Sequence, residues 1–200
     1  MGIFRVIRRQ GRSPRRGGAK NLTYPTEIEN YRAITGAINT WLGERQNGYA
    51  DLHRATKSLL AFFMPVWSVF EGQALSTNAN QQSIREYVNQ NVPENADIRR
   101  LQPALDFFTD RYVEGARTNR RFTSLVGNRT DIARDLTSVL LGQTVLTREK
   151  VICLLLIVYC LRNNMAHGLK WQWGYADQYE SIVHAVHVLM RTLDGFPPLS

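Results

Sequence analysis

The chain has 200 residues, of which 44% are hydrophobic and 10% aromatic, and it carries a formal net charge of +8. This composition excludes fibrous and wholly disordered classes, and the length is sufficient for one sizeable hydrophobic core. The longest apolar run covers residues 151–161. It is shorter than the roughly 20 residues that a helix needs to span a bilayer, so no membrane span is expected.

Positive charge is concentrated in residues 1–26, which contain no acidic residue. The cations of this segment are Arg5, Arg8, Arg9, Arg12, Arg15, Arg16 and Lys20. We expect a flexible basic arm that binds RNA phosphates without regard to sequence, since each neutralised phosphate releases a counterion. A solvated tail without a binding role and an organelle transit peptide remain open as alternatives.

Residues 27–200 are expected to form a single helical domain. Apolar residues recur there at intervals of three and four, and strand-like alternation is not evident. The sequence therefore predicts an all-α fold, an up-and-down bundle of about six or seven helices.

The expected helices follow one another along the chain. They are a stripe from Ile28 to Leu42, a helix from about Tyr49 to Glu71, a seam from Ile98 to Tyr112, a helix beginning near Ile132, one opening at Thr147, and a last one ending at Gly195. Pro65 should kink the second helix, and Thr147 is expected to be an N-cap. The uncharged residues 72–83 are predicted to be a loop, with a short helix after it.

Cysteine and histidine spacing indicates no metal or disulfide framework. Cys153 and Cys160 lie seven residues apart on one expected helix, a rise of about 10 Å, whereas a disulfide allows roughly 7 Å. They are expected to be reduced core residues, which favours a reducing, cytoplasmic compartment. His184 and His187 have a spacing that can bind zinc, but no third ligand follows, so we expect surface histidines.

The most informative pattern lies at the end of the longest apolar run. Residues 151–161 are apolar around the whole helix circumference, which predicts a helix that is central in the bundle, or covered on one face by a second copy of the protein. Arg162, Asn163, Asn164 and His167 follow directly. On an ideal helix Arg162 and His167 lie about 140° apart, so a two-fold axis that brings two copies together is the favoured way to form one site.

The string RNNMAHG, residues 162–168, followed by Lys170, resembles the signature of HEPN domains. That signature is an arginine, a polar residue and a histidine, with four to six positions between the arginine and the histidine. Here Asn163 occupies the polar position. The resemblance covers roughly residues 50–195 and says nothing about residues 1–26.

The resemblance implies a dimeric helical bundle with the motif at the interface and, commonly, a metal-independent endoribonuclease without a cofactor. Such proteins act as toxins or as effectors of defence against phage, and an antitoxin or sensor protein is a candidate partner. His167 would be the general acid or base, Arg162 would bind the phosphate, and Asn163 would orient the phosphate or the histidine. Weaker RNA contacts would come from Asn164 and Lys170 and, because of the charge of the basic arm, from Arg5, Arg8, Arg9, Arg12, Arg15 and Arg16.

Other interpretations of the same residues stay open. The chain can be a non-catalytic helical module that binds nucleic acid or a protein partner. Arg162 and His167 can be cations that interact with the carbonyls at a helix C-terminus. Glu71 closes an aromatic run and is expected to be a solvated helix end rather than a partner of the site.

Overall fold

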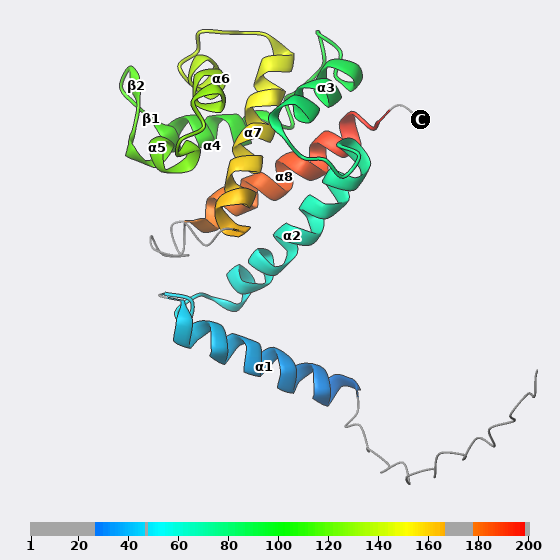
Figure 1. The fold of residues 1–200 in the computed structure, drawn as a ribbon, viewed down its shortest axis with the longest axis vertical. Coiled ribbons are helices and arrows are strands. Elements are labelled where there is room, and N and C mark those ends of the chain that lie inside the picture. Colours follow the sequence, from blue (N-terminus) through cyan, green and yellow to red (C-terminus); the bar gives the residue numbers. More distant parts are fainter. Residues whose placement is uncertain (1–26, 47, 167–177, 199–200) are drawn as a thin grey trace, which may run out of the picture. The chain divides into compact units, whose positions relative to one another are not determined.

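A computed structural model describes residues 27–46, 48–166 and 178–198 of the chain. These residues form eight helices and one small antiparallel hairpin (Figure 1). The elements are α1 (Glu27–Arg45), α2 (Arg54–Ala74), α3 (Gln81–Asn91), α4 (Gln102–Tyr112), β1 (Val113–Glu114), β2 (Arg117–Thr118), α5 (Arg120–Val126), α6 (Thr130–Leu140), α7 (Thr147–Ala166) and α8 (Tyr179–Gly195). The predicted all-α class is confirmed, with eight helices in the described residues where about six or seven were expected, and with a hairpin that the sequence did not predict.

The chain divides into two compact units, Met1–Thr40 and Trp41–Ser200. The boundary lies within α1, and the single domain from residue 27 onward stays a prediction. The helices α2 to α8 belong to the second unit, and so do all the described residues considered below.

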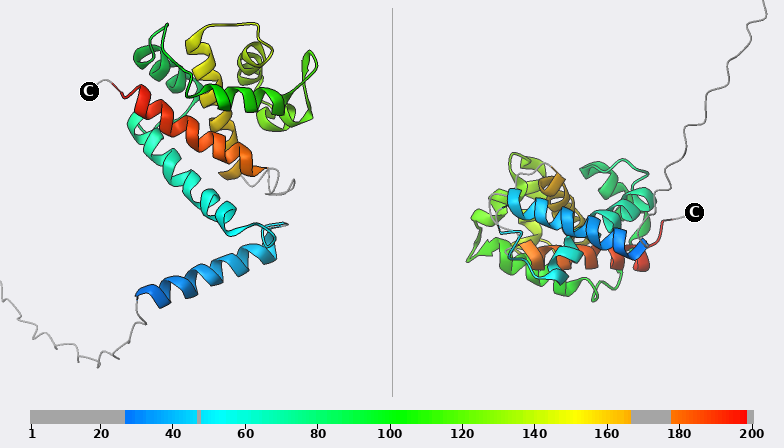
Figure 2. Two further views of the ribbon diagram at one scale, coloured as in Figure 1. Left: turned by 180° about the vertical axis from the view of Figure 1, so that it is seen from behind. Right: turned by 90° about the horizontal axis from the view of Figure 1, so that it is seen from below.

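Helix α2 packs along α8, and the two run side by side in the views of Figures 1 and 2. Its buried face carries Phe63, Trp67 and Phe70, which follow the spacing of three and four residues that one helix face requires. Pro65 is exposed and lies inside an unbroken helix. The helix starts after His53, whose Nδ1 accepts a hydrogen bond from the Ala55 amide at 3.3 Å and so caps the first turn.

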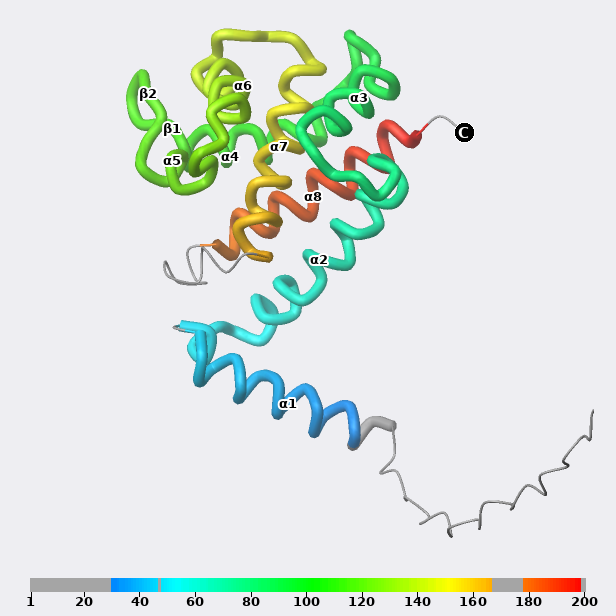
Figure 3. Tube along the Cα trace, viewed as in Figure 1, coloured from blue at the N-terminus to red at the C-terminus, as the bar shows by residue number. Residues whose placement is uncertain are grey.

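Helix α7 is the centre of the second unit. It contacts α3, α4, α5, α6 and α8, and the path of the chain around it is easiest to follow in Figure 3. Residues 151–158 are at most 1% exposed, because helices of the same chain cover them on all sides. The apolar run allowed either a helix central in the bundle or a helix covered on one face by a second copy of the protein. The structure has the first arrangement, so no second copy is needed to bury the helix.

The connection between α2 and α3 is shorter than predicted. Asn80 and Ser83 form a reciprocal capping box, in which the Ser83 amide donates to Asn80 Oδ1 at 2.9 Å and the Asn80 amide donates to Ser83 Oγ at 3.0 Å. This pair starts α3 at Gln81, within the segment expected to be a loop. The loop is consequently limited to residues 75–80.

Both cysteines are buried in α7, as predicted for core residues. Burial is the main reason why the pKa of the Cys153 thiol is raised, with smaller contributions from Glu149 and Asp135. A protonated, inaccessible thiol does not act as a nucleophile. In the part of the chain that the structure describes, none of the helices is long and apolar enough to cross a membrane.

Candidate functional site

Three of the predicted site residues lie in the last turns of α7. These are Arg162, Asn163 and Asn164, and they directly follow the buried segment of that helix. The other predicted residues lie outside the described part of the chain, namely His167, Lys170, Arg5, Arg8, Arg9, Arg12, Arg15 and Arg16. The structure therefore defines the arginine end of the motif.

The guanidinium of Arg162 is held by three neighbours. Its Nη1 donates to Asn163 Oδ1 at 2.9 Å, and its Nη2 lies 3.5 Å from Glu71 Oε2. Its Cζ lies 5.5 Å from the centre of the Trp67 ring, within the range of a cation–π interaction. The side chain of Arg162 is 28% exposed, so it is fixed in one orientation and still reaches the surface.

Glu71 is not the solvated helix end that the sequence predicted. Helix α2 continues to Ala74, and the Glu71 side chain is only 20% exposed. Its Oε2 accepts a hydrogen bond from Trp67 Nε1 at 2.5 Å and faces Arg162. Because α2 and α7 are distant in sequence, no local pattern could identify this ion pair.

Asn163 and Asn164 are both buried near the end of α7. Asn163 is 8% exposed, and its side-chain oxygen accepts from Arg162, so it orients the arginine, while its expected role toward the phosphate or His167 stays a prediction. Asn164 is 3% exposed, and its Nδ2 donates to the Leu125 carbonyl of α5 at 2.9 Å. The prediction of Asn164 as an RNA contact is therefore wrong, because its amide ties α7 to α5 inside the protein.

Another interpretation of Arg162 is a cation that interacts with the carbonyls at the C-terminus of its helix. Among the described residues, its hydrogen bond and ion pair are to side chains and not to carbonyls of the last turn. Its Nε is buried and has no acceptor in the same part of the chain. The exposed part of the guanidinium is a suitable group for binding an anion, whereas the buried Nε is not reached from the surface.

His184 and His187 lie on α8. The structure gives no group of three or more His, Cys, Asp or Glu side chains that could hold a metal ion in residues 27–46, 48–166 and 178–198. His187 is exposed, as predicted, but His184 is half-buried and stacks on Phe107 of α4, with ring centres 4.2 Å apart. Burial, followed by the neighbouring His187, lowers the pKa of His184.

The chain matches no family model, no curated protein and no solved structure in the comparisons made with each.

Proposed function

We propose that the protein is a cytoplasmic, metal-independent endoribonuclease of the HEPN type. His167 removes the proton from a ribose 2′-hydroxyl, and the resulting oxygen attacks the adjacent phosphorus. The bond from phosphorus to the 5′-oxygen breaks, and that oxygen takes up a proton. The products are a 2′,3′-cyclic phosphate and a 5′-hydroxyl end.

The observation that carries this proposal is the setting of Arg162. Its guanidinium lies at the partly exposed end of a helix that is otherwise buried, and Glu71, Asn163 and Trp67 hold it there. A fixed arginine can donate two parallel hydrogen bonds to phosphate oxygens as charge develops on them. Its attraction to phosphate is stronger at the edge of a dry region than in bulk water.

Two copies of the motif in a dimer would bring two histidines to one phosphate, one as base and one as acid. Exposed apolar residues on α2 are compatible with such a contact, since Phe62 is 62% and Val69 is 52% exposed on the helix that carries Glu71. Burial of such residues is a common source of dimer stability. The expected mass in solution is that of two chains, which light scattering after gel filtration measures.

The test is cleavage of a single-stranded RNA in the presence of EDTA. His167→Ala and Arg162→Ala should each lower the rate by about a hundredfold or more, the range for loss of general acid–base catalysis or of one oxyanion donor. Matched controls are His53→Asn, which retains a residue able to cap α2, and Arg134→Ala, which removes an arginine that is 77% exposed. Circular dichroism must show that all four variants are folded.

The controls distinguish cleavage by the proposed residues from cleavage by a contaminating nuclease, and loss of catalysis from loss of folding. Control variants should cleave like the wild type, and mass spectrometry should find 2′,3′-cyclic phosphate ends. Cleavage by His167→Ala at the wild-type rate would remove the histidine from the mechanism. Cleavage that stops in EDTA would contradict the metal-independent reaction.

A second candidate function is a non-catalytic module that binds RNA or a protein. The observation in its favour is the Glu71 carboxylate, which already neutralises part of the charge on Arg162. In that case the wild type binds RNA without cleaving it, and Arg162→Ala weakens the complex.

A further inference from the structure

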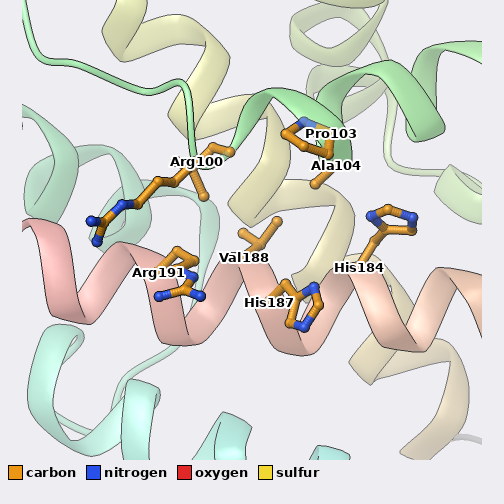
Figure 4. A pocket seen from close by; sticks show the side chains of 8 residues that line it. Arg100, Pro103, Ala104, His184, His187, Val188 and Arg191 are labelled. Carbon is orange, nitrogen blue, oxygen red and sulfur yellow. The ribbon is translucent and has the colours of Figure 1, made fainter.

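A pocket of about 400 Å³ lies between the start of α4 and the face of α8 (Figure 4). Four cationic or titratable side chains line it, Arg100 from the segment before α4, and His184, His187 and Arg191 from α8. The remaining lining is mostly apolar and consists of Leu101, Pro103, Ala104 and Val188. It shares no residue with the Arg162 cluster.

The positive charge of this pocket is not balanced by acidic lining residues. No Asp or Glu is among the side chains that line it. Asp97 interacts with Arg100 electrostatically, but its carboxylate is hydrogen-bonded to Arg99, with Arg99 Nη2 at 2.7 Å from Oδ2. In the described part of the chain, neither Arg100 nor Arg191 forms an ion pair.

This arrangement differs from that of three other arginines in the second unit. Arg85 pairs with Asp135, Arg148 with Glu94, and Arg162 with Glu71. Cations that line one pocket without a counter-charge repel one another, and a bound anion reduces this repulsion. The pocket therefore has the electrostatic character of an anion site.

His184 adds a fixed hydrogen-bonding group to the wall. Its ring stacks on Phe107 with planes 16° apart, so its position does not depend on a ligand. A neutral imidazole has one donor nitrogen and one acceptor nitrogen, and protonation turns the acceptor nitrogen into a second donor.

The size and lining of the pocket indicate more than a bare anion. Small-molecule sites have volumes of about 300–1,000 Å³ and combine an apolar wall with a few polar groups. Guanidinium groups bind phosphate oxygens through paired hydrogen bonds, and Val188, Pro103 and Ala104 offer apolar contact to a base or a sugar. A nucleoside phosphate has both parts.

We propose that this pocket binds one nucleoside phosphate unit, with Arg100 and Arg191 on the phosphate and the apolar lining against the nucleoside. The unit comes either from a free mononucleotide or from one residue of a single-stranded RNA. The site does not depend on the ribonuclease proposal, because it uses other residues and no cleavage.

The experiment measures binding to the full-length protein at fixed, low salt. The probes are AMP and inorganic phosphate by calorimetry, and a fluorescent 2′-O-methyl oligonucleotide without a terminal phosphate by anisotropy. The methylated RNA lacks the 2′-hydroxyl nucleophile and so cannot be cleaved. The variants are Arg100→Ala, Arg191→Ala and the double variant, with Arg134→Ala as the control of equal charge.

Each single substitution should weaken binding of the occupying probe by about tenfold or more, the usual effect of one hydrogen-bonded charge on a phosphate. The double variant should lose more than either single variant, and Arg134→Ala should stay within about twofold of the wild type. If AMP shows this dependence the ligand is a free nucleotide, and if only the oligonucleotide shows it the ligand is RNA.

Three results would overturn the proposal. These are absence of binding of all probes to the wild type, equal affinities of the double variant and the Arg134→Ala control, and inorganic phosphate binding as tightly as the better of the two nucleotide probes. Wild-type protein that binds methylated RNA through Arg100 and Arg191 but never cleaves unmodified RNA would refute the ribonuclease proposal and leave this one standing.

Discussion

Glu71 contacts both Trp67 and Arg162. Replacing it by Ala or by Gln distinguishes the contribution of the hydrogen bond to stability from that of the ion pair. Its Oε2 accepts the Trp67 Nε1 hydrogen bond and faces the Arg162 guanidinium. In Glu71→Ala the indole N–H loses its acceptor inside the protein, where Trp67 is 1% exposed, which costs about 1–3 kcal/mol. The ion pair is partly exposed and screened, so its loss adds only about 0.5–1 kcal/mol.

Glu71→Gln retains an oxygen that can accept from the indole and removes the charge. We therefore expect a loss of unfolding free energy of about 1.5–4 kcal/mol for Glu71→Ala and about 0.5–1 kcal/mol for Glu71→Gln. Urea unfolding followed by tryptophan fluorescence and circular dichroism measures both. Glu86→Gln is the matched control, since Glu86 is exposed on α3 and its replacement should change stability by less than about 0.5 kcal/mol.

A double-mutant cycle isolates the contact with Arg162. Glu71→Gln is combined with Arg162→Met, which retains an unbranched apolar stem against Trp67. The coupling energy should be about 0.5–1 kcal/mol. A coupling energy of zero within error would refute the argument that Glu71 holds Arg162 in place.

Two further predictions concern groups whose environments the structure defines. Asn164→Ala should lower the unfolding free energy by about 0.5–1.5 kcal/mol, because the Leu125 carbonyl loses its donor at 2.9 Å and keeps only Arg129 Nη1 at 3.5 Å; urea unfolding tests this, and an unchanged midpoint would contradict it. For His184, the folded pKa lies below the usual value of 6.5, so the unfolded chain binds more protons and stability falls as the pH decreases through about 6.5 toward the lowered pKa. His184→Gln should show a smaller loss of unfolding free energy between pH 7.5 and pH 5.5 than the wild type, and an equal loss would exclude this contribution.

Periodic apolar residues predicted the helices that pack through one face. The spacing of Ile132, Leu136 and Val139 predicts α6, and the end of α8 at Gly195 agrees with the glycine and the prolines after it. The apolar run before Arg162 predicted the most buried helix of the chain. These features are local in sequence, which is why the sequence alone was sufficient.

Short and non-local features were not predictable in this way. Helix α5 has seven residues, fewer than the periodic pattern needs to be recognised. Asn119 starts it by accepting from the amides of Arg121 and Phe122, and a single capping residue before a polar segment is a weak signal. Thr147 was predicted to be the N-cap of α7, but it is the first helical residue, because Lys150 donates to the Leu146 carbonyl.

In both candidate sites, the contacts between different helices were also not predictable from the sequence. The position of Arg162 at the end of a buried helix followed from sequence, whereas its pairing with Glu71 depends on how α2 packs near α7. Likewise, His184 and His187 were recognised as a pair on one helix, but Arg100 joins them only because α4 packs on α8. The sequence predicts which residues share a face of one helix, but it does not predict which residues of different helices contact each other.

The two groups of arginines are suited to different tasks. Arg162 has an acidic partner, an aromatic ring and an amide that fix its orientation, so little reorganisation is needed when charge develops on a phosphate beside it. Arg100 and Arg191 form no ion pair among the described residues. Their charge therefore remains available to attract an anion, but their guanidinium groups are not held in one orientation. Loss of Arg162 should therefore affect stability and rate together, while loss of Arg100 or Arg191 should affect affinity alone. A variant of the second kind that abolished cleavage at saturating RNA would contradict this division.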